Sequence, residues 1–323
     1  MAESGLVIVD KPGGMTSHDV VARVRRLAGT RRVGHAGTLD PMATGVLVVG
    51  IEKATRLLGH LTLTEKEYEA TIRLGQATVS DDAEGEILPP EGGEHAADPA
   101  GVPPATLRAA LASFTGQISQ IPPRISAIKV DGQRAYRLTR SGAAPDLAAR
   151  PVTITRLDVL ATRQPGDHLL DVDVAVTCSS GTYIRAIARD LGARLGTGGH
   201  LTALRRTRVG PYQVAAARTL GQLAEKLELI PLAEAATAAF PRLDLTADEA
   251  RQVAHGRRLA DVAAPRIRPG PDGEPIAGFG PDGGLVALLT DSGGELRPIA
   301  VFALAESHAP ANGPGPRRRG PGA

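Results

Sequence analysis

One twelve-residue segment, Gly34 to Gly45 with the sequence GHAGTLDPMATG, constrains this chain more than any other. Three glycines and one proline fix its backbone path, and Asp40 is its one carboxylate. Apolar runs at 6–9 and 46–49 predict buried strands on either side. An Asp-Pro pair often does no more than start a turn. An acid on a rigid loop between two buried strands is equally well placed for chemistry, so the rest of the chain has to decide.

The composition indicates a globular protein. With 323 residues and 42% hydrophobic content, the chain is long enough for a full core and two domains. Its single cysteine, Cys178, excludes a disulfide framework and a multi-cysteine metal site. No apolar run approaches the length of a membrane span, and the N-terminus enters a predicted strand without a leader. We therefore expect a cytoplasmic protein that is not attached to a membrane.

Motifs for cofactor binding are missing from the sequence. It contains no Walker pattern, no dinucleotide fingerprint, no zinc-deaminase pattern and no metal-ligand spacing. We expect any chemistry at Asp40 to need neither a cofactor nor a metal ion.

The arginines and tyrosines point towards nucleic acid. The formal net charge of +2 says little by itself, but arginines gather beside candidate loops, where they are suited to phosphate contacts. These clusters are Arg23/Arg25/Arg26, Arg31/Arg32, Arg134/Arg137/Arg140 and Arg205/Arg206/Arg208. Tyr68 and Tyr183 are half of the four tyrosines, and such rings stack on flipped bases, although core packing is their commoner role. His35 is able to bind a base edge or a phosphate, although a lone loop histidine is more often structural.

Apolar periodicity predicts alternating helices and strands. A helix is expected after a cap at Thr16 or Ser17, with a stop at Gly29. The further elements are a strand at 68–74, a helix at 106–114, a strand at 169–178, a helix after 182, a short helix capped by Thr246 and Glu249, and strands at 285–290 and 297–304. Residues 121–146 read as a projecting loop, 229–240 as a domain boundary, and 309–323 as a disordered tail.

Arg185 breaks a local rule. It falls in the first turn of a predicted helix, where a cation opposes the positive end of the helix dipole. Such violations are expected where a site needs the residue, although an ordinary surface arginine is the alternative. If Arg185 reaches Asp40, it lowers the pKa of that carboxyl and holds it ionised.

Five segments, in this order, carry a resemblance to a known family. They are KPGGMTSHDVV, VGHAGTLDPMATGVLVVG, KEYEATIRLG, CSSGTYIRAIARDLG and GGHLTALRRTRVG. Together they resemble the bacterial tRNA pseudouridine-55 synthases of the TruB type over roughly residues 5–215. The resemblance implies an α+β fold, with a mixed, largely antiparallel sheet crossed by a catalytic cleft. It also implies a catalytic domain at 1–228, a small PUA-like RNA-binding β-barrel at 240–305 and a disordered tail at 306–323.

The resemblance assigns roles to individual residues. Asp40 matches the catalytic aspartate, Arg185 the arginine paired with it, and Tyr68 the tyrosine that stacks on the target uracil. Lys11 and Pro12 match the N-terminal motif that buttresses the cleft.

Other matches lie around this centre. Tyr183 and Leu204 match pocket-lining residues, and His35 matches one that supports the flipped-out RNA. Arg205 is an expected RNA contact. The segment 122–146 matches a loop that closes over the RNA, although Ile125 stands where the family commonly has an aromatic residue.

The implied reaction converts uridine to pseudouridine at position 55 in the T-loop of tRNA. It breaks the N1–C1′ bond, turns the uracil and joins C5 to C1′, with no redox change. Asp40 either attacks C1′ or removes a C2′ proton, and the sequence leaves both routes open. The expected partner is the T-arm of tRNA, with no obligate protein partner and a monomeric enzyme.

Three alternatives remain at this stage. The first is a guide-RNA-dependent pseudouridine synthase, which has related motifs but long basic extensions. The second is an RNA-binding or folding factor that uses the cleft only as a clamp. The third is a glycoside hydrolase, which needs a second carboxylate such as Glu67 or Glu69, neither of which lies in a loop motif.

Overall fold

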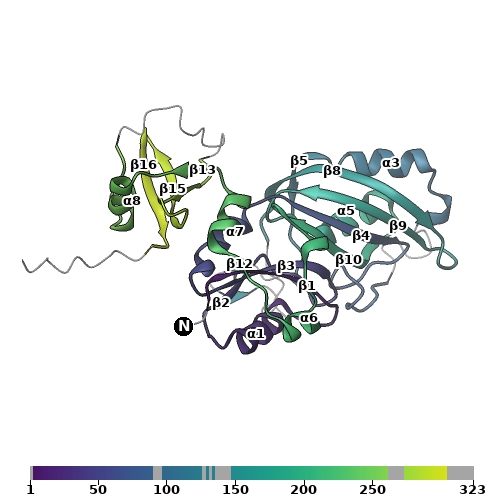
Figure 1. Ribbon diagram of the computed structural model, residues 1–323. Helices are drawn as coiled ribbons and strands as arrows, with labels where there is room; N and C mark the ends of the chain where they lie inside the picture. Colours follow the sequence, from purple (N-terminus) through teal and green to yellow (C-terminus); the bar gives the residue numbers. More distant parts are fainter. Residues whose placement is uncertain are drawn as a thin grey trace, which may run out of the picture. The chain divides into compact units, whose positions relative to one another are not determined.

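The computed structural model describes residues 3–89, 97–125, 129–130, 133–134, 147–260 and 273–303. The chain divides after Ala239 into two compact units, which we describe separately (Figure 1).

A ten-stranded mixed sheet organises the first unit. Its central path runs β12 (Ile230–Pro231), β1 (Gly5–Lys11), β3 (Thr44–Ile51), β10 (Gly199–Val209), β4 (Lys66–Leu74), β9 (Leu170–Cys178), β8 (Arg150–Arg163) and β5 (Gly116–Gln120). Two short strands lie off this path: β2 (Val33–Ala36) pairs with β3, and β11 (Tyr212–Gln213) pairs with β10. Among these strands only β3 and β10 pair in parallel, which confirms the expected mixed, largely antiparallel sheet.

Helices pack against the sheet. The α-helices of the unit are α1 (Ser17–Ala28), α2 (Leu58–Thr62), α3 (Pro104–Ala112), α5 (Ile184–Leu195), α6 (Leu220–Glu225) and α7 (Leu232–Ala239). Short 3-10 turns lie at η1 (Glu52–Arg56), η3 (Pro99–Gly101) and η4 (Val214–Ala216). Helix α3 starts two residues before its predicted position, because Pro104 is tolerated in a first helical turn.

The two helices that matter for the site form where their sequences predict. Thr16 caps α1 in a capping box with Asp19, and Gly29 ends it in the left-handed conformation. Helix α1 packs on β1 and β3 through Val20 and Val24, close to α6 (Figure 1).

Helix α5 buries one apolar face against a second apolar cluster. Ile184, Ile187 and Leu191 pack with residues of β4, β9 and β10, and α3 lies beside the same helix (Figure 1). This packing holds the first turn of α5, and with it Arg185, against the sheet.

The second unit contains a four-stranded sheet. Its order is β13 (Arg242–Asp244), β14 (Ile276–Phe279), β15 (Leu285–Ser292) and β16 (Glu295–Val301), and α8 (Ala247–Ala254) packs on it. Thr246 and Glu249 form the predicted capping box of α8. Over the described residues of this unit the first and last strands do not pair, so the expected PUA-like barrel is not confirmed.

Two expectations fall largely outside the described residues. Of the segment 122–146, the structure describes 122–125 and a short hairpin of β6 (Lys129–Val130) and β7 (Gln133–Arg134). The tail at 306–323 lies wholly outside them. Within the described part of the chain, no helix has the length and apolar character needed to cross a membrane.

Candidate active site

Asp40 lies on the connection between β2 and β3. The structure shortens the loop predicted at 34–45, because 34–36 belong to β2 and β3 begins at Thr44. His35 is therefore a strand residue opposite Val49, not a loop residue. Strand β2 has only four residues and includes glycine and alanine, so its sequence carries little strand signal.

The last residue of β1, Lys11, supports the Asp40 loop. The ammonium of Lys11, which is fully buried, donates to the carbonyl oxygens of Pro12 at 2.9 Å, Pro41 at 3.1 Å and Ala43 at 2.6 Å. Burial lowers the pKa of Lys11, and the nearby charge of Asp40 opposes this shift. Lys11 thus ties the backbone on the C-terminal side of Asp40 to the end of β1.

The start of α1 holds the other side of the loop. Ser17 Oγ donates to the carbonyl of Leu39 at 3.1 Å and accepts from its amide at 2.8 Å. The amide of Gly14 donates to the carbonyl of Pro41 at 2.8 Å. Asp40 is therefore presented by a backbone that is bonded on both sides.

Arg185 reaches Asp40 across the site. Its Nε lies 3.0 Å from Asp40 Oδ2, and its Nη1 lies 3.1 Å from Asp82 Oδ2. Nη1 also donates to the carbonyl of Ser80 at 2.8 Å, and Nη2 donates to that of Ile125 at 3.0 Å. The predicted Asp40–Arg185 pair is present, and the cation that opposes the dipole of α5 is held by two carboxylates.

Asp82 is a site residue that the sequence reasoning missed. It is buried, its Oδ1 accepts from Ser80 Oγ and from the amide of Glu84, and Arg185 contacts its other oxygen. The run Ser80-Asp81-Asp82 soon after the strand 68–74 was the available signal. Polar residues after a strand usually form a solvated turn, so this run by itself does not indicate a site.

Opposing influences act on the pKa of Asp40. Burial in the cleft raises this pKa above 3.8, Arg185 lowers it, and Asp82 raises it again, with a net upward direction. The side chain keeps 34% of its surface exposed towards the pocket. The expectation that Arg185 alone decides the ionisation of Asp40 is thus incomplete, because desolvation outweighs the ion pair.

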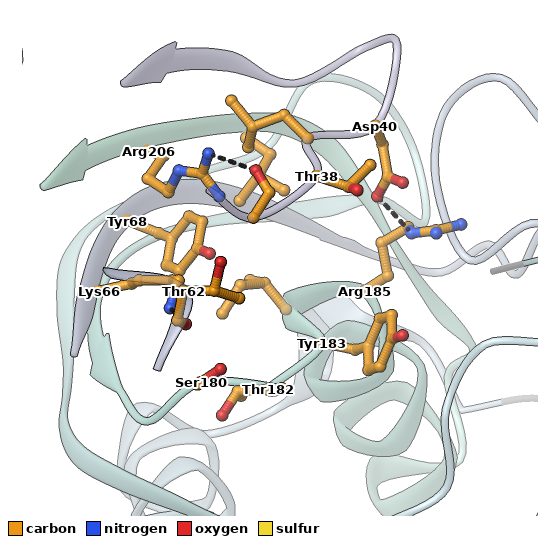
Figure 2. A pocket seen from close by; sticks show the side chains of 15 residues that line it. Thr38, Asp40, Thr62, Lys66, Tyr68, Ser180, Thr182, Tyr183, Arg185 and Arg206 are labelled. Atoms are coloured by element: carbon orange, nitrogen blue, oxygen red, sulfur yellow. Dashed lines mark hydrogen bonds and ion pairs between the residues drawn. The ribbon is translucent and has the colours of Figure 1, made fainter. Parts of the chain in front are cut away.

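A cavity of about 320 Å³ opens between Asp40 and Tyr68. Its lining includes five of the predicted site residues, namely Asp40, Tyr68, Tyr183, Arg185 and Leu204. Figure 2 shows Asp40 and Arg185 on one side of the pocket and Tyr68 on the other. Lys66 and Arg206 line the pocket beside Tyr68. The sequence placed Arg206 only in an arginine cluster suited to phosphate contacts, and it gave Lys66 no role.

The two tyrosines reach the pocket from different elements. Tyr68 comes from β4, is almost fully buried, and its phenol has a pKa raised above 10 by that burial. Tyr183 precedes α5, where Gln120 binds its backbone through a donated bond of 3.1 Å and an accepted bond of 2.8 Å. Burial therefore favours the neutral phenol of Tyr68.

Four predicted residues lie away from this pocket. Lys11, Pro12 and Arg205 line a separate cavity of about 380 Å³, where Arg205 forms a two-pronged ion pair with Asp10 at 2.8 and 3.0 Å. His35 packs edge-on against His18, with ring centroids 5.6 Å apart. None of these four residues lines the pocket between Asp40 and Tyr68.

No candidate metal site occurs among the described residues. Across residues 3–89, 97–125, 147–260 and 273–303, no three His, Cys, Asp or Glu side chains are grouped so as to hold an ion.

Comparison with protein families decides the family. The N-terminal domain of TruB family pseudouridylate synthases matches residues 25–184. The C-terminal domain of tRNA pseudouridylate synthase B matches 185–237, and the C-terminal domain of tRNA pseudouridine synthase II matches 240–303. A protein named tRNA pseudouridine synthase B from Arthrobacter sp. is 60% identical over 93% of this chain and 97% of its own length. The chain belongs to the TruB family. It is a pseudouridine synthase, an isomerase, as its motifs predicted.

Other relatives agree. The protein of the same name from Thermobifida fusca is 58% identical, over 93% of this chain and 98% of its own length. Among solved structures, a Cbf5-Nop10-Gar1 complex matches with a TM-score of 0.68 at 28% identity, over 93% of this chain and 85% of that one. An H/ACA ribonucleoprotein bound to a substrate RNA containing 2′-deoxyuridine gives a TM-score of 0.66 at 25% identity, over 94% and 86%. The TruB family membership and the fold thus rest on both sequence and structure.

Proposed function

We propose that this TruB family member converts uridine 55 in the T-loop of tRNA to pseudouridine, without a cofactor and without an obligate protein partner. The observation that carries the proposal is the Asp40–Arg185 pair at one side of a pocket whose other side is Tyr68. A cavity of about 320 Å³ falls within the size range of small-molecule sites. The relatives named tRNA pseudouridine synthase B, at 54–60% identity, support tRNA as the substrate.

In this proposal Asp40, Arg185 and Tyr68 each act in a step of the reaction that fits their position in the pocket. The ionised carboxylate of Asp40 attacks C1′ or removes a C2′ proton, and in either route the C1′–N1 bond breaks. Arg185 fixes the direction of that carboxylate, since Asp82 and Ser80 hold the guanidinium from behind. The ring of Tyr68 supports the uracil while it turns.

The hydrogen bonds that hold the Asp40 loop support the attack on the sugar. Attack on a sugar carbon requires the carboxylate to be held to within a fraction of an ångström. Lys11 and Ser17 hold the backbone on both sides of Asp40, and neither needs to touch the RNA.

Outside the pocket, the proposal assigns RNA binding to electrostatic contacts with the phosphates. A base in a T-loop is unstacked at lower cost than one in a duplex, and arginines on the surface supply phosphate contacts that are independent of sequence. His35, Arg205 and the segment 122–146 belong to this outer contact in the proposal.

Two alternatives lose support. A glycoside hydrolase needs a second carboxylate opposite Asp40, but Glu67 pairs with Arg208 and Glu69 is exposed, and neither lines the pocket. A guide-RNA-dependent synthase is disfavoured by the near full-length match to relatives whose name specifies tRNA.

The site of modification tests the proposal. An unmodified tRNA transcript is incubated with the protein alone, and pseudouridine is mapped at each position. A matched transcript carries cytidine at position 55. The proposal predicts pseudouridine at position 55 of the first transcript and none in the second. Product at another position, or a requirement for an added guide RNA, would contradict it.

A further inference from the structure

The pocket contains two buried cations, Lys66 and Arg206, that have no acidic partner among the residues that the structure describes. Lys66 is 5% exposed and Arg206 is 1% exposed. Within the described residues neither forms an ion pair, whereas Arg185, the other buried cation of the pocket, contacts two carboxylates. A buried charge without a counter-ion is costly, so its retention needs a reason.

Neutral carbonyl groups hold both cations in place. The ammonium of Lys66 donates to the carbonyls of Thr62 and Thr64, both at 2.8 Å. The guanidinium of Arg206 donates from Nε to Val46 at 2.7 Å and from Nη2 to Gly37 at 3.0 Å. These bonds orient the two groups and satisfy part of their hydrogen-bonding capacity, but they leave the net charge of each uncancelled.

Lys66 and Arg206 approach each other at Gly37. A Cβ atom on that glycine would lie 3.4 Å from Arg206 Nη1 and 3.6 Å from Lys66 Cε, and its φ of +81° is one that glycine adopts without strain. Arg206 is also close enough to Tyr68 to oppose the rise that burial causes in the pKa of its phenol. Figure 2 shows Lys66, Tyr68 and Arg206 together, across the pocket from Asp40.

Charge of the opposite sign develops in this part of the pocket if the proposed reaction takes place. When C1′–N1 breaks, the bonding electron pair stays on N1, and the detached uracil is an anion with charge spread over N1 and its carbonyl oxygens. This holds whether Asp40 attacks C1′ or removes the C2′ proton. The base faces Tyr68 while the sugar faces Asp40, so the charge appears on the side of Lys66 and Arg206.

We propose that Lys66 and Arg206, here called the cation pair, stabilise the detached uracil anion between cleavage of the C1′–N1 bond and formation of the C1′–C5 bond. The inference rests on the proposed function and deepens it. When C5 bonds to C1′, the bond from C1′ to Asp40 breaks in the first route, and C2′ regains its proton in the second. A proton then leaves C5 and a proton is taken up at N1, so that atoms and charge balance in an isomerisation. Preorganised, buried cations suit this role because they need no rearrangement as the charge appears.

The first experiment varies both the cation and the acidity of the leaving base. Lys66→Met removes the charge at similar length, and Lys66→Arg keeps it. Single-turnover cleavage of the glycosidic bond is measured in tRNA carrying uridine or 5-fluorouridine, whose fluorine stabilises the anion by electron withdrawal. Arg73→Gln is the matched control, because Arg73 lies on the same strand but is paired with Asp171 at 2.7 Å.

The expected result is a deficit that depends on the base. Lys66→Met should lose about 100-fold in rate with uridine, the cost of one missing electrostatic donor, and less than about 10-fold with 5-fluorouridine. Lys66→Arg and Arg73→Gln should stay within about 10-fold of wild type with both RNAs. Equal deficits of Lys66→Met on both RNAs, with wild type active, would overturn this inference alone. An inactive wild type would overturn the proposed function and the inference with it.

A second measurement keeps the test valid if Lys66→Met does not fold. Burial, followed by the nearby charge of Arg206, lowers the pKa of Lys66 to about 8. The groups facing it are Arg206 from β10, Tyr68 from β4, whose pKa is raised, and Cys178 from β9, with a pKa of about 11. Tyr68 and Cys178, whose pKa values both lie above 10, keep their charge between pH 7 and 9.

The rate of wild type with uridine should therefore fall as pH rises through about 8, because Lys66 loses its proton. Lys66→Arg should show no such fall, and it shares every other titrating group, including those of the RNA. Identical pH profiles of wild type and Lys66→Arg would overturn the inference.

Discussion

Asp82 and Arg185 form a buried ion pair at 3.1 Å, and both side chains are at most 5% exposed. The pair lies beside the Asp40 carboxylate: Asp82 holds Nη1 of the guanidinium, while Nε is turned to Asp40. A charge as deeply buried as that of Arg185 is costly unless its partner is present, so the position of Arg185 depends on Asp82.

Asp82→Asn is expected to lower the single-turnover rate of pseudouridine formation by about 100-fold, because Arg185 loses its buried anchor and Asp40 loses its orientation. Binding of tRNA should change less than about 3-fold, since Asp82 is buried. The neighbouring Asp81→Asn is the control, as Asp81 pairs with Arg189 and does not line the pocket. A similar loss in both variants would point to damage of the whole turn.

Gly45 should be far less replaceable than Gly14. Both adopt a left-handed φ, +95° and +79°, so alanine costs each about 1 kcal/mol in backbone strain. A Cβ on Gly45 would also lie 2.2 Å from the carbonyl oxygen of Arg206, where β3 pairs with β10, whereas Gly14 has open space. Urea unfolding should show Gly45→Ala to be destabilised by at least about 2 kcal/mol more than Gly14→Ala. Equal losses would mean that the two strands separate readily there.

Asp40→Asn should unfold at a higher temperature than wild type at neutral pH. Burial raises the pKa of Asp40 in the folded protein, so the folded state favours the protonated, neutral form. The stability linked to this group is present below its unfolded pKa of 3.8 and is lost as pH rises through the raised folded value. Asparagine has no such charge, so the advantage of the variant should shrink as pH is lowered. A lower melting temperature of Asp40→Asn at pH 7 would show that the pair with Arg185 outweighs desolvation.

Elements and contacts close in sequence were predictable. Helix α1 carried its own cap, apolar spacing and glycine stop, and the strand from Tyr68 showed plain alternation. Arg185 was found because a cation in a first helical turn has a local cost that can be read from the sequence.

Contacts between distant segments were not predictable. Arg185 and Asp82 are 103 residues apart, and Arg206 bonds the carbonyl of Val46 across 160 residues. The sequence singled out Arg205 as an RNA contact, but it could not show which of two adjacent arginines on a strand faces the pocket. The register of β10 against β3 and β4 decides this, and it places Arg206 in the pocket beside Tyr68.

Pseudouridine formation by Asp40→Asn tests the central claim most directly. The wild type and the variant are incubated side by side with an unmodified tRNA transcript, with no added metal or nucleotide, and binding of the transcript is measured for both. We predict pseudouridine at the T-loop uridine with wild type, and none with a variant that is folded and binds the RNA equally well. Equal binding with product from both proteins would contradict the role of Asp40, and equal binding with product from neither would contradict the proposed activity itself.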